Sequence, residues 1–141
     1  MADNYTRKVH NAIFGLTPTY TLYPAVAAGT VAGTVVTSGA GAWGADKELI
    51  AAAGIATEYW VCAFDLDTAG AAQGYVIDIE VAGTTHVTSF RFDVTAVTAN
   101  LSRFPAAPFP IYVVASSQLT ARAAGVAAKV IGVSTLVATG Y

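Results

Sequence analysis

Three carboxylates near the middle of the chain have residue types and a spacing that could support chemistry. Asp65 and Asp67 flank Leu66, so on a strand both carboxylates lie on one face and, with loop carbonyls, could bind a calcium ion. Glu58 together with either aspartate could form the acid and base pair of a glycosidase. The same aspartate pair also commonly ends a strand at a turn, and no aromatic-lined cleft is evident around Glu58. We therefore expect neither a metal site nor an enzyme here.

The other chemistry-bearing residues form no recognisable set. His10 and His86 have no zinc partner at ligand spacing, and no segment resembles a nucleophile elbow. The glycine-rich stretches Gly29–Gly44 and Gly70–Gly74 lack the Gly-Lys-Ser/Thr ending of a phosphate-binding loop. Cys62 lies in an apolar run, and as a lone cysteine it excludes an intramolecular disulfide; we interpret it as a small buried hydrophobe. The sequence predicts no catalytic residue and no cofactor.

The composition narrows the class of protein. Of the 141 residues, 55% are hydrophobic and only 11% are charged, against about 25% charged in a typical soluble domain. Much of the hydrophobic excess is alanine. A chain that enters a large assembly needs little surface charge, because much of its surface becomes interface. An Ala-rich stable domain from a GC-rich genome would show the same composition.

Charge and hydropathy exclude several partners. The net charge of −2 gives no basic patch for nucleic acid. Residues 1–10 are polar and lack the apolar stretch of a signal peptide. No apolar run approaches the roughly 18 residues of a membrane span, because Gly, Thr and Ser interrupt each one. We expect a soluble protein made in the cytoplasm, with no nucleic-acid or membrane partner.

Short runs of Val, Thr, Ile, Tyr and Phe, cut by glycines, predict an all-β chain from residue 20 onward. Such spacing is typical of an antiparallel β-sandwich of about eight strands, jelly-roll-like, rather than of βαβ units. Two Ala-rich segments, 45–53 and 119–129, could instead be helical, but neither has an apolar stripe at helical spacing. The candidate strands are 20–23, 29–37, 47–53, 58–65, 74–81, 86–95, 111–115, 118–123 and 129–137. The expected core includes Trp60, Ile77, Ile79, Phe90, Phe92 and Ile131.

Alternation predicts one hairpin in detail. Residues 75–81 and 86–94 each alternate between apolar and polar side chains, so each strand has one buried face. A two-residue type II′ loop at Gly83–Thr84 places Ile77 opposite Phe90 and Tyr75 opposite Phe92 on the inside. On the outside, Asp78 then lies diagonal to Arg91, on a face that is wet or meets another polar surface.

Two segments stand apart as candidates for protein contact. Residues 100–110 contain three prolines, which cannot donate to a sheet ladder, and carry Arg103, Phe104 and Phe109. They form either a corner between the sheets or a contact loop, since aromatics and arginine are enriched at interfaces.

Residues 1–15 form an N-terminal arm before a single domain over 16–141. The arm's candidate contact residues are Tyr5, Arg7, Lys8 and His10; it docks on a partner or adds an edge strand to its own sandwich.

Three segments resemble a recurrent pattern in the small β-sandwich virion proteins of tailed bacteriophages. The first runs from Ala42-Trp43-Gly44 through Lys47–Ala51 to Ile55–Val61. The rest form a closing pattern of three short runs: Phe109–Val113, then Gln118–Ala124 with one outward arginine, then Lys129–Val133, so that the three segments are the first stretch, the two runs 109–113 and 118–124 taken together, and the final run. The resemblance covers roughly the C-terminal two-thirds of the chain and leaves out residues 1–15. It brings no catalytic or ligand residues with it.

What the resemblance implies is a capsid decoration, or cement, protein. Such a protein would form a homo-oligomer, expected to be a trimer, bind the major capsid protein of a phage head, and reside in the virion. A tail, neck or fibre-associated module is the alternative within virions, and a carbohydrate-binding module is the alternative from another class. The position of the exposed aromatics distinguishes a cement protein from a carbohydrate-binding module. An open platform of Tyr5, Tyr20, Tyr23, Trp43 and Trp60 would favour sugar binding, and burial of these residues against another copy would favour a cement protein.

Overall fold

The computed structural model describes residues 15, 17–24, 33–94, 103–105 and 111–140; within these, 67–68, 86–90 and 103–105 are described by their backbone alone. This part of the chain folds into ten β-strands and contains no helix. The strands are β1 (Thr19–Tyr23), β2 (Thr34–Ala40), β3 (Lys47–Ile50), β4 (Tyr59–Ala69), β5 (Gly74–Val81), β6 (Thr84–Asp93), β7 (Arg103–Pro105), β8 (Ile111–Val113), β9 (Leu119–Gly125) and β10 (Val130–Thr139). The predicted all-β sandwich is confirmed.

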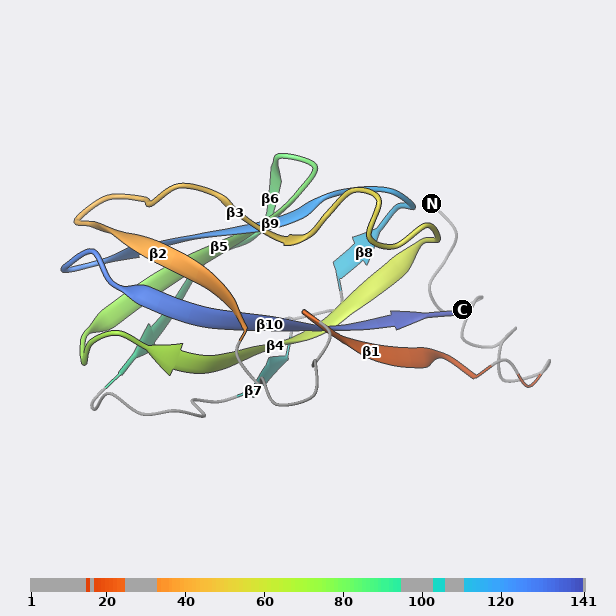
Figure 1. The fold of residues 1–141 in the computed structure, drawn as a ribbon, viewed down its shortest axis with the longest axis horizontal. Helices are drawn as coiled ribbons and strands as arrows, with labels where there is room; N and C mark the ends of the chain where they lie inside the picture. The colour runs from red at the N-terminus through yellow and green to blue at the C-terminus, as the bar shows by residue number, and fades with distance from the viewer. Residues whose placement is uncertain (1–14, 16, 25–32, 95–102, 106–110, 141) are drawn as a thin grey trace.

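The strands form two facing layers joined through β2 (Figure 1). Sheet A contains β1, β10, β4, β7, β8 and the first half of β2; sheet B contains β6, β5, β9, β3 and the second half of β2. β2 pairs with β10 up to Thr37 and with β9 from Ser38 onward, so it crosses from one layer to the other. The β2–β9 pair is parallel, and every other pair is antiparallel.

The core lies between the layers and takes alternate residues from each strand, as the pleat requires. Sheet A contributes Val61, Ile131, Val133 and Val137, and sheet B contributes Ile77, Ile79, Leu119, Ala121 and Ala123. Tyr75 is also fully buried; its ring stacks on Phe92 with 5.5 Å between centroids, and its hydroxyl donates a hydrogen bond to the carbonyl of Ala71. The predicted core residues Ile77, Ile79 and Ile131 are confirmed, and Phe92 packs against the core from a partly buried position. The side chain of Phe90 lies outside the described part.

All nine predicted strands exist in the structure, with ends that move by up to five residues. Both Ala-rich segments that could have been helical are strands, β3 and β9, because their backbones complete the ladders of neighbouring strands. β7 was not predicted. It lies in the proline-rich segment, where Arg103–Pro105 pairs with β4 at the edge of sheet A, a position that tolerates a proline.

The predicted hairpin is correct in its body and wrong at its turn. Tyr75 pairs with Phe92 and Ile77 with Phe90, as expected. Beyond this point the pairing shifts twice, and each shift leaves one extra residue on β6 without a partner on β5. As a result, Val81 pairs with Thr84 and the loop is Ala82–Gly83. Both loop residues have positive φ, 49° and 78°, which is the conformation of a type I′ turn rather than type II′.

Candidate functional site

The outward surface of sheet A is broad and apolar. Tyr20 pairs with Ala138, which in turn pairs with Trp60, and Trp60 pairs with Tyr112. Residues paired across neighbouring strands point to the same side, so these side chains form a row across β1, β10, β4 and β8. Tyr20 is 57% exposed and Tyr112 is 38% exposed, and between them Ala138 is fully buried.

Two more exposed apolar side chains lie on the outer side of sheet A, on β2 and at the start of β10; the outward pair Ser134 and Asp65 separates them from the aromatic row. Val35 and Val130 alternate with the buried residues Val36 and Ile131, so they point outward from sheet A, and both are exposed. Two charged residues whose side chains the structure describes lie on this surface: Asp65, which is half-buried, and Glu58, which is hydrogen-bonded to the Tyr112 hydroxyl. We call the surface formed by Tyr20, Val35, Trp60, Tyr112 and Val130 the sheet A face.

Trp60 belongs to this face and not to the core, so its predicted core position is wrong. The run 59–64 is apolar on both sides of the strand, and its core positions are taken by Tyr59, Val61 and Phe64. Trp60 is half-buried and packs on Tyr112, with 5.0 Å between the ring centroids and 53° between the ring planes. The Tyr112 hydroxyl donates a hydrogen bond to Glu58, which fixes this aromatic pair on the surface.

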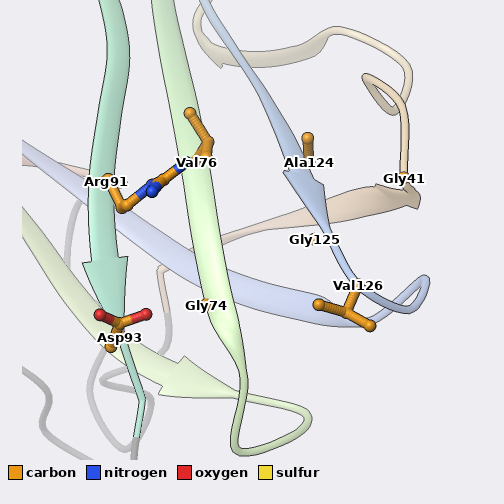
Figure 2. Close-up of a pocket in the computed structure, with 8 residues that line it drawn as sticks. All are labelled: Gly41, Gly74, Val76, Arg91, Asp93, Ala124, Gly125 and Val126. Carbon is orange, nitrogen blue, oxygen red and sulfur yellow. The ribbon is translucent and has the colours of Figure 1, made fainter.

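A second feature, a shallow groove, lies on the outward surface of sheet B. Two adjoining hollows of about 410 and 500 Å³ share Gly41, Val76, Arg91 and Ala124 as lining residues. The first also touches Asp93, Gly74, Gly125 and Val126, and the second also touches Ala42 and Trp43. Figure 2 shows Arg91 on β6 pointing toward Val76 on β5, with the Asp93 carboxylate beside Gly74 further along the same strands. We call these two hollows together the sheet B groove.

The loop between β2 and β3 carries Trp43 into this groove and is tied to β9. The amides of Gly41 and Gly44 donate hydrogen bonds of 2.7 and 2.8 Å to the carbonyls of Gly125 and Ala123. A side chain at Gly44 would come within 2.2 Å of the Thr37 carbonyl oxygen, so only glycine allows the loop to lie this close to β2. The loop therefore presents Trp43, which is 40% exposed, in a defined position.

A charged cluster beneath the loop holds the tryptophan ring. Arg122 on β9 pairs with Asp78 on β5 and donates hydrogen bonds of 3.1 and 2.9 Å to its carboxylate. A second carboxylate, Glu80, lies 3.4 Å from the same guanidinium. These contacts, led by the Asp78 hydrogen bonds, raise the pKa of Arg122. The Arg122 guanidinium lies over the Trp43 ring, 5.0 Å from its centroid, in a cation–π contact.

This cluster corrects the prediction for the outer side of the hairpin. We expected Asp78 on a wet or polar surface, diagonal to Arg91. Instead Asp78 is 2% exposed and Glu80 is also buried. The reason is that β5 is flanked by β9 as well as β6, and β9 places Arg122 directly opposite Asp78.

The predicted contact residues fall mostly outside the described part of the chain. Tyr5, Arg7, Lys8 and His10 lie in residues 1–14, and Phe109 lies in residues 106–110, so their predicted roles are untested. Arg103 and Phe104 are placed by their backbone alone, in β7, where they pair with Asp65 and Phe64 of β4.

Among the other residues considered for chemistry, the structure brings together none of the side chains that it describes. Glu58 is engaged by Tyr112, and the side chains of Asp67 and His86 lie outside the described part. In the part that the structure describes, no three His, Cys, Asp or Glu side chains come together as metal ligands would. Cys62 is half-buried, and burial raises the pKa of its thiol.

Sequence reasoning missed the sheet B groove. The only binding role that the sequence suggests for Trp43 is in a sugar-binding platform with Tyr20 and Trp60, and the structure places Trp43 over sheet B while those two lie on sheet A. Tyr23 packs against the core, and Tyr5 lies outside the described residues. The available hint was the glycine spacing around Trp43, because Gly39 and Gly44 allow the close backbone contacts of this loop and Gly41 has a positive φ.

Comparison with known proteins gives no identification: no family model, no curated protein and no solved structure matches this chain. No helix in the residues that the structure describes is long and apolar enough to span a membrane.

Proposed function

We propose that this chain is a non-enzymatic structural protein whose sheet A face packs against other protein chains. The observation that carries the proposal is the row of aromatic side chains on this face, Tyr20, Trp60 and Tyr112. Aromatic residues are enriched, and charged residues depleted, at the centres of protein interfaces. An exposed group of apolar side chains such as this aromatic row typically marks a contact site on a soluble domain.

The narrower proposal is that the protein decorates the head of a tailed bacteriophage. Its support is the resemblance of residues 42–61 and 109–133 to small virion proteins, together with the low charge of the whole chain. The contacts that follow are with further copies of this chain, as a homotrimer, and with the major capsid protein. A tail, neck or fibre position in the virion is the alternative.

The N-terminal arm belongs to the same proposal. Tyr5 offers contact area, and Arg7 offers forked hydrogen bonds to carboxylates, so residues 1–15 would anchor the domain on the shell or on a neighbouring copy.

The test is co-sedimentation of the purified protein with empty shells assembled from the major capsid protein of the phage proposed to encode it. The wild type should bind the shells saturably, and the double variant Tyr20→Ser, Tyr112→Ser should lose most of that binding. Val126→Ser is the matched control, because Val126 is 81% exposed but lies at the sheet B groove. Equal shell binding by all three proteins, or no binding by the wild type, would contradict the proposal.

A further inference from the structure

The sheet B groove has the chemistry of a ligand site that is separate from the sheet A face. Its two hollows, about 410 and 500 Å³, are of the size that small-molecule sites have. Most of the lining residues are small, Gly41, Gly74, Ala124 and Gly125, so few bulky side chains of the protein project into the hollows.

One end of the groove offers an aromatic surface that is already in place. The Arg122 guanidinium covers one side of the Trp43 ring, so the exposed part of the ring is its other side and its edge. Arg122 is itself held by two buried carboxylates, and the loop is hydrogen-bonded to β9. A ligand that packs on this ring would therefore find it ordered and would cost little conformational entropy.

The rest of the groove offers one hydrogen-bond donor group and one acceptor group. Arg91 and Asp93 lie two residues apart on β6, point to the same side and are both exposed (Figure 2). The Asp93 carboxylate lies over Gly74, where any side chain on β5 would come within 2.8 Å of its oxygen. Guanidinium and carboxylate groups side by side favour a ligand whose polar edge both donates and accepts hydrogen bonds.

These features select the ligand class by charge and shape. Arg91 and Asp93 are the charged residues that line the groove, and their opposite charges together favour neither an anion nor a cation. A pyranose ring fits both needs, because its C–H face packs on the negative face of an aromatic ring and its hydroxyls donate to carboxylate and accept from guanidinium. We propose that the sheet B groove binds a neutral oligosaccharide, with one sugar on Trp43 and a neighbouring sugar between Arg91 and Asp93. The inference does not depend on the proposed function, since it uses the opposite face of the sandwich.

The test is calorimetric titration of the full chain with maltohexaose, cellohexaose, mannohexaose and chitohexaose, each followed in parallel by tryptophan fluorescence. At least one should bind saturably. Trp43→Ala should weaken that binding by at least about tenfold, the loss expected for one well-packed aromatic contact. Asp93→Asn, which keeps the shape of the side chain, should weaken it as well.

The matched control is Tyr112→Ala, which removes an exposed aromatic from the sheet A face and should leave sugar binding unchanged. Each variant must first give the wild-type circular dichroism spectrum. Saturable binding to none of the four sugars would overturn the inference, and so would binding that survives Trp43→Ala. If Trp43→Ala instead lowers the mass of the particle in solution, the groove is a protein contact and the sugar assignment is wrong.

Discussion

Ser38→Ala should destabilise the protein because Ser38 fastens β2 at the point where it crosses between the sheets. Thr37 is the last residue of β2 paired with β10, and Ser38 is the first paired with β9. The Ser38 hydroxyl, 1% exposed, accepts a 3.0 Å hydrogen bond from the amide of Lys129. It also lies 3.0 Å from the Ala127 carbonyl oxygen, to which it donates. The Ser38 side chain therefore holds the turn between β9 and β10 against β2 through two hydrogen bonds.

The size of the effect follows from these two bonds. Each intramolecular hydrogen bond contributes about 1 kcal/mol net, and a part-buried amide left without its partner costs somewhat more. Ser38→Ala should therefore lower the free energy of unfolding by about 2 to 3 kcal/mol. With an unfolding entropy of about 2.1 cal/mol/K per residue, a chain of 141 residues should lose roughly 7 to 10 °C in melting temperature.

The measurement is urea denaturation followed by tryptophan fluorescence, with a calorimetric melt as a second readout. Thr37→Ala is the control, since Thr37 is the neighbouring residue on β2 but is exposed, and it should change stability by less than about 0.5 kcal/mol. If Ser38→Ala unfolds at the wild-type urea concentration, or if both variants lose the same stability, the strand-crossing role of Ser38 is refuted.

Three further predictions test other parts of the structure. Burial, and then proximity to Tyr23, raise the pKa of Tyr59 to about 12; the folded chain keeps a proton that the unfolded chain loses near pH 10, so stability should fall as pH rises from 10 toward 12. Tyr59→Phe should flatten that fall in urea midpoints measured over this range, and parallel curves would contradict it. Ala82→Asn should raise stability by about 1 kcal/mol in a thermal melt, because asparagine tolerates the positive φ at this turn position better than alanine; an unchanged or lower melting temperature would refute the turn assignment. Cys62 should react slowly with Ellman's reagent until urea unfolds the chain, because burial raises the pKa of its thiol; immediate reaction in buffer would show that the thiol is open.

Local patterns predicted those parts of the fold that depend on neighbouring residues. The alternation in residues 74–81 correctly predicted both ends of β5 and its pairing with Phe90 and Phe92. The turn was misplaced because two irregularities in β6 shift the pairing, and a residue pattern does not record such shifts. Trp60 was misassigned because the run 59–64 is apolar on both sides, so alternation could not tell the core side from the outer side.

The candidate sites depend on contacts between distant segments, which the sequence did not indicate. Arg122 reaches Asp78 because β9 lies beside β5, although the two residues are 44 positions apart. The row on the sheet A face requires β1, β10, β4 and β8 to be adjacent, an order that strand spacing alone does not give. The low charge of the chain predicted that some surface would be contact surface, but not which one.

The most direct test of the central proposal is the mass of the particle in solution, measured by light scattering from low to high micromolar concentration. If the sheet A face joins copies of this chain, the wild type should form a discrete oligomer, a trimer in the narrower proposal. The Tyr20→Ser, Tyr112→Ser variant should then be a monomer, while Val126→Ser should match the wild type. A wild type that remains a monomer at the highest concentration, or an oligomer that the double variant leaves unchanged, would contradict the account.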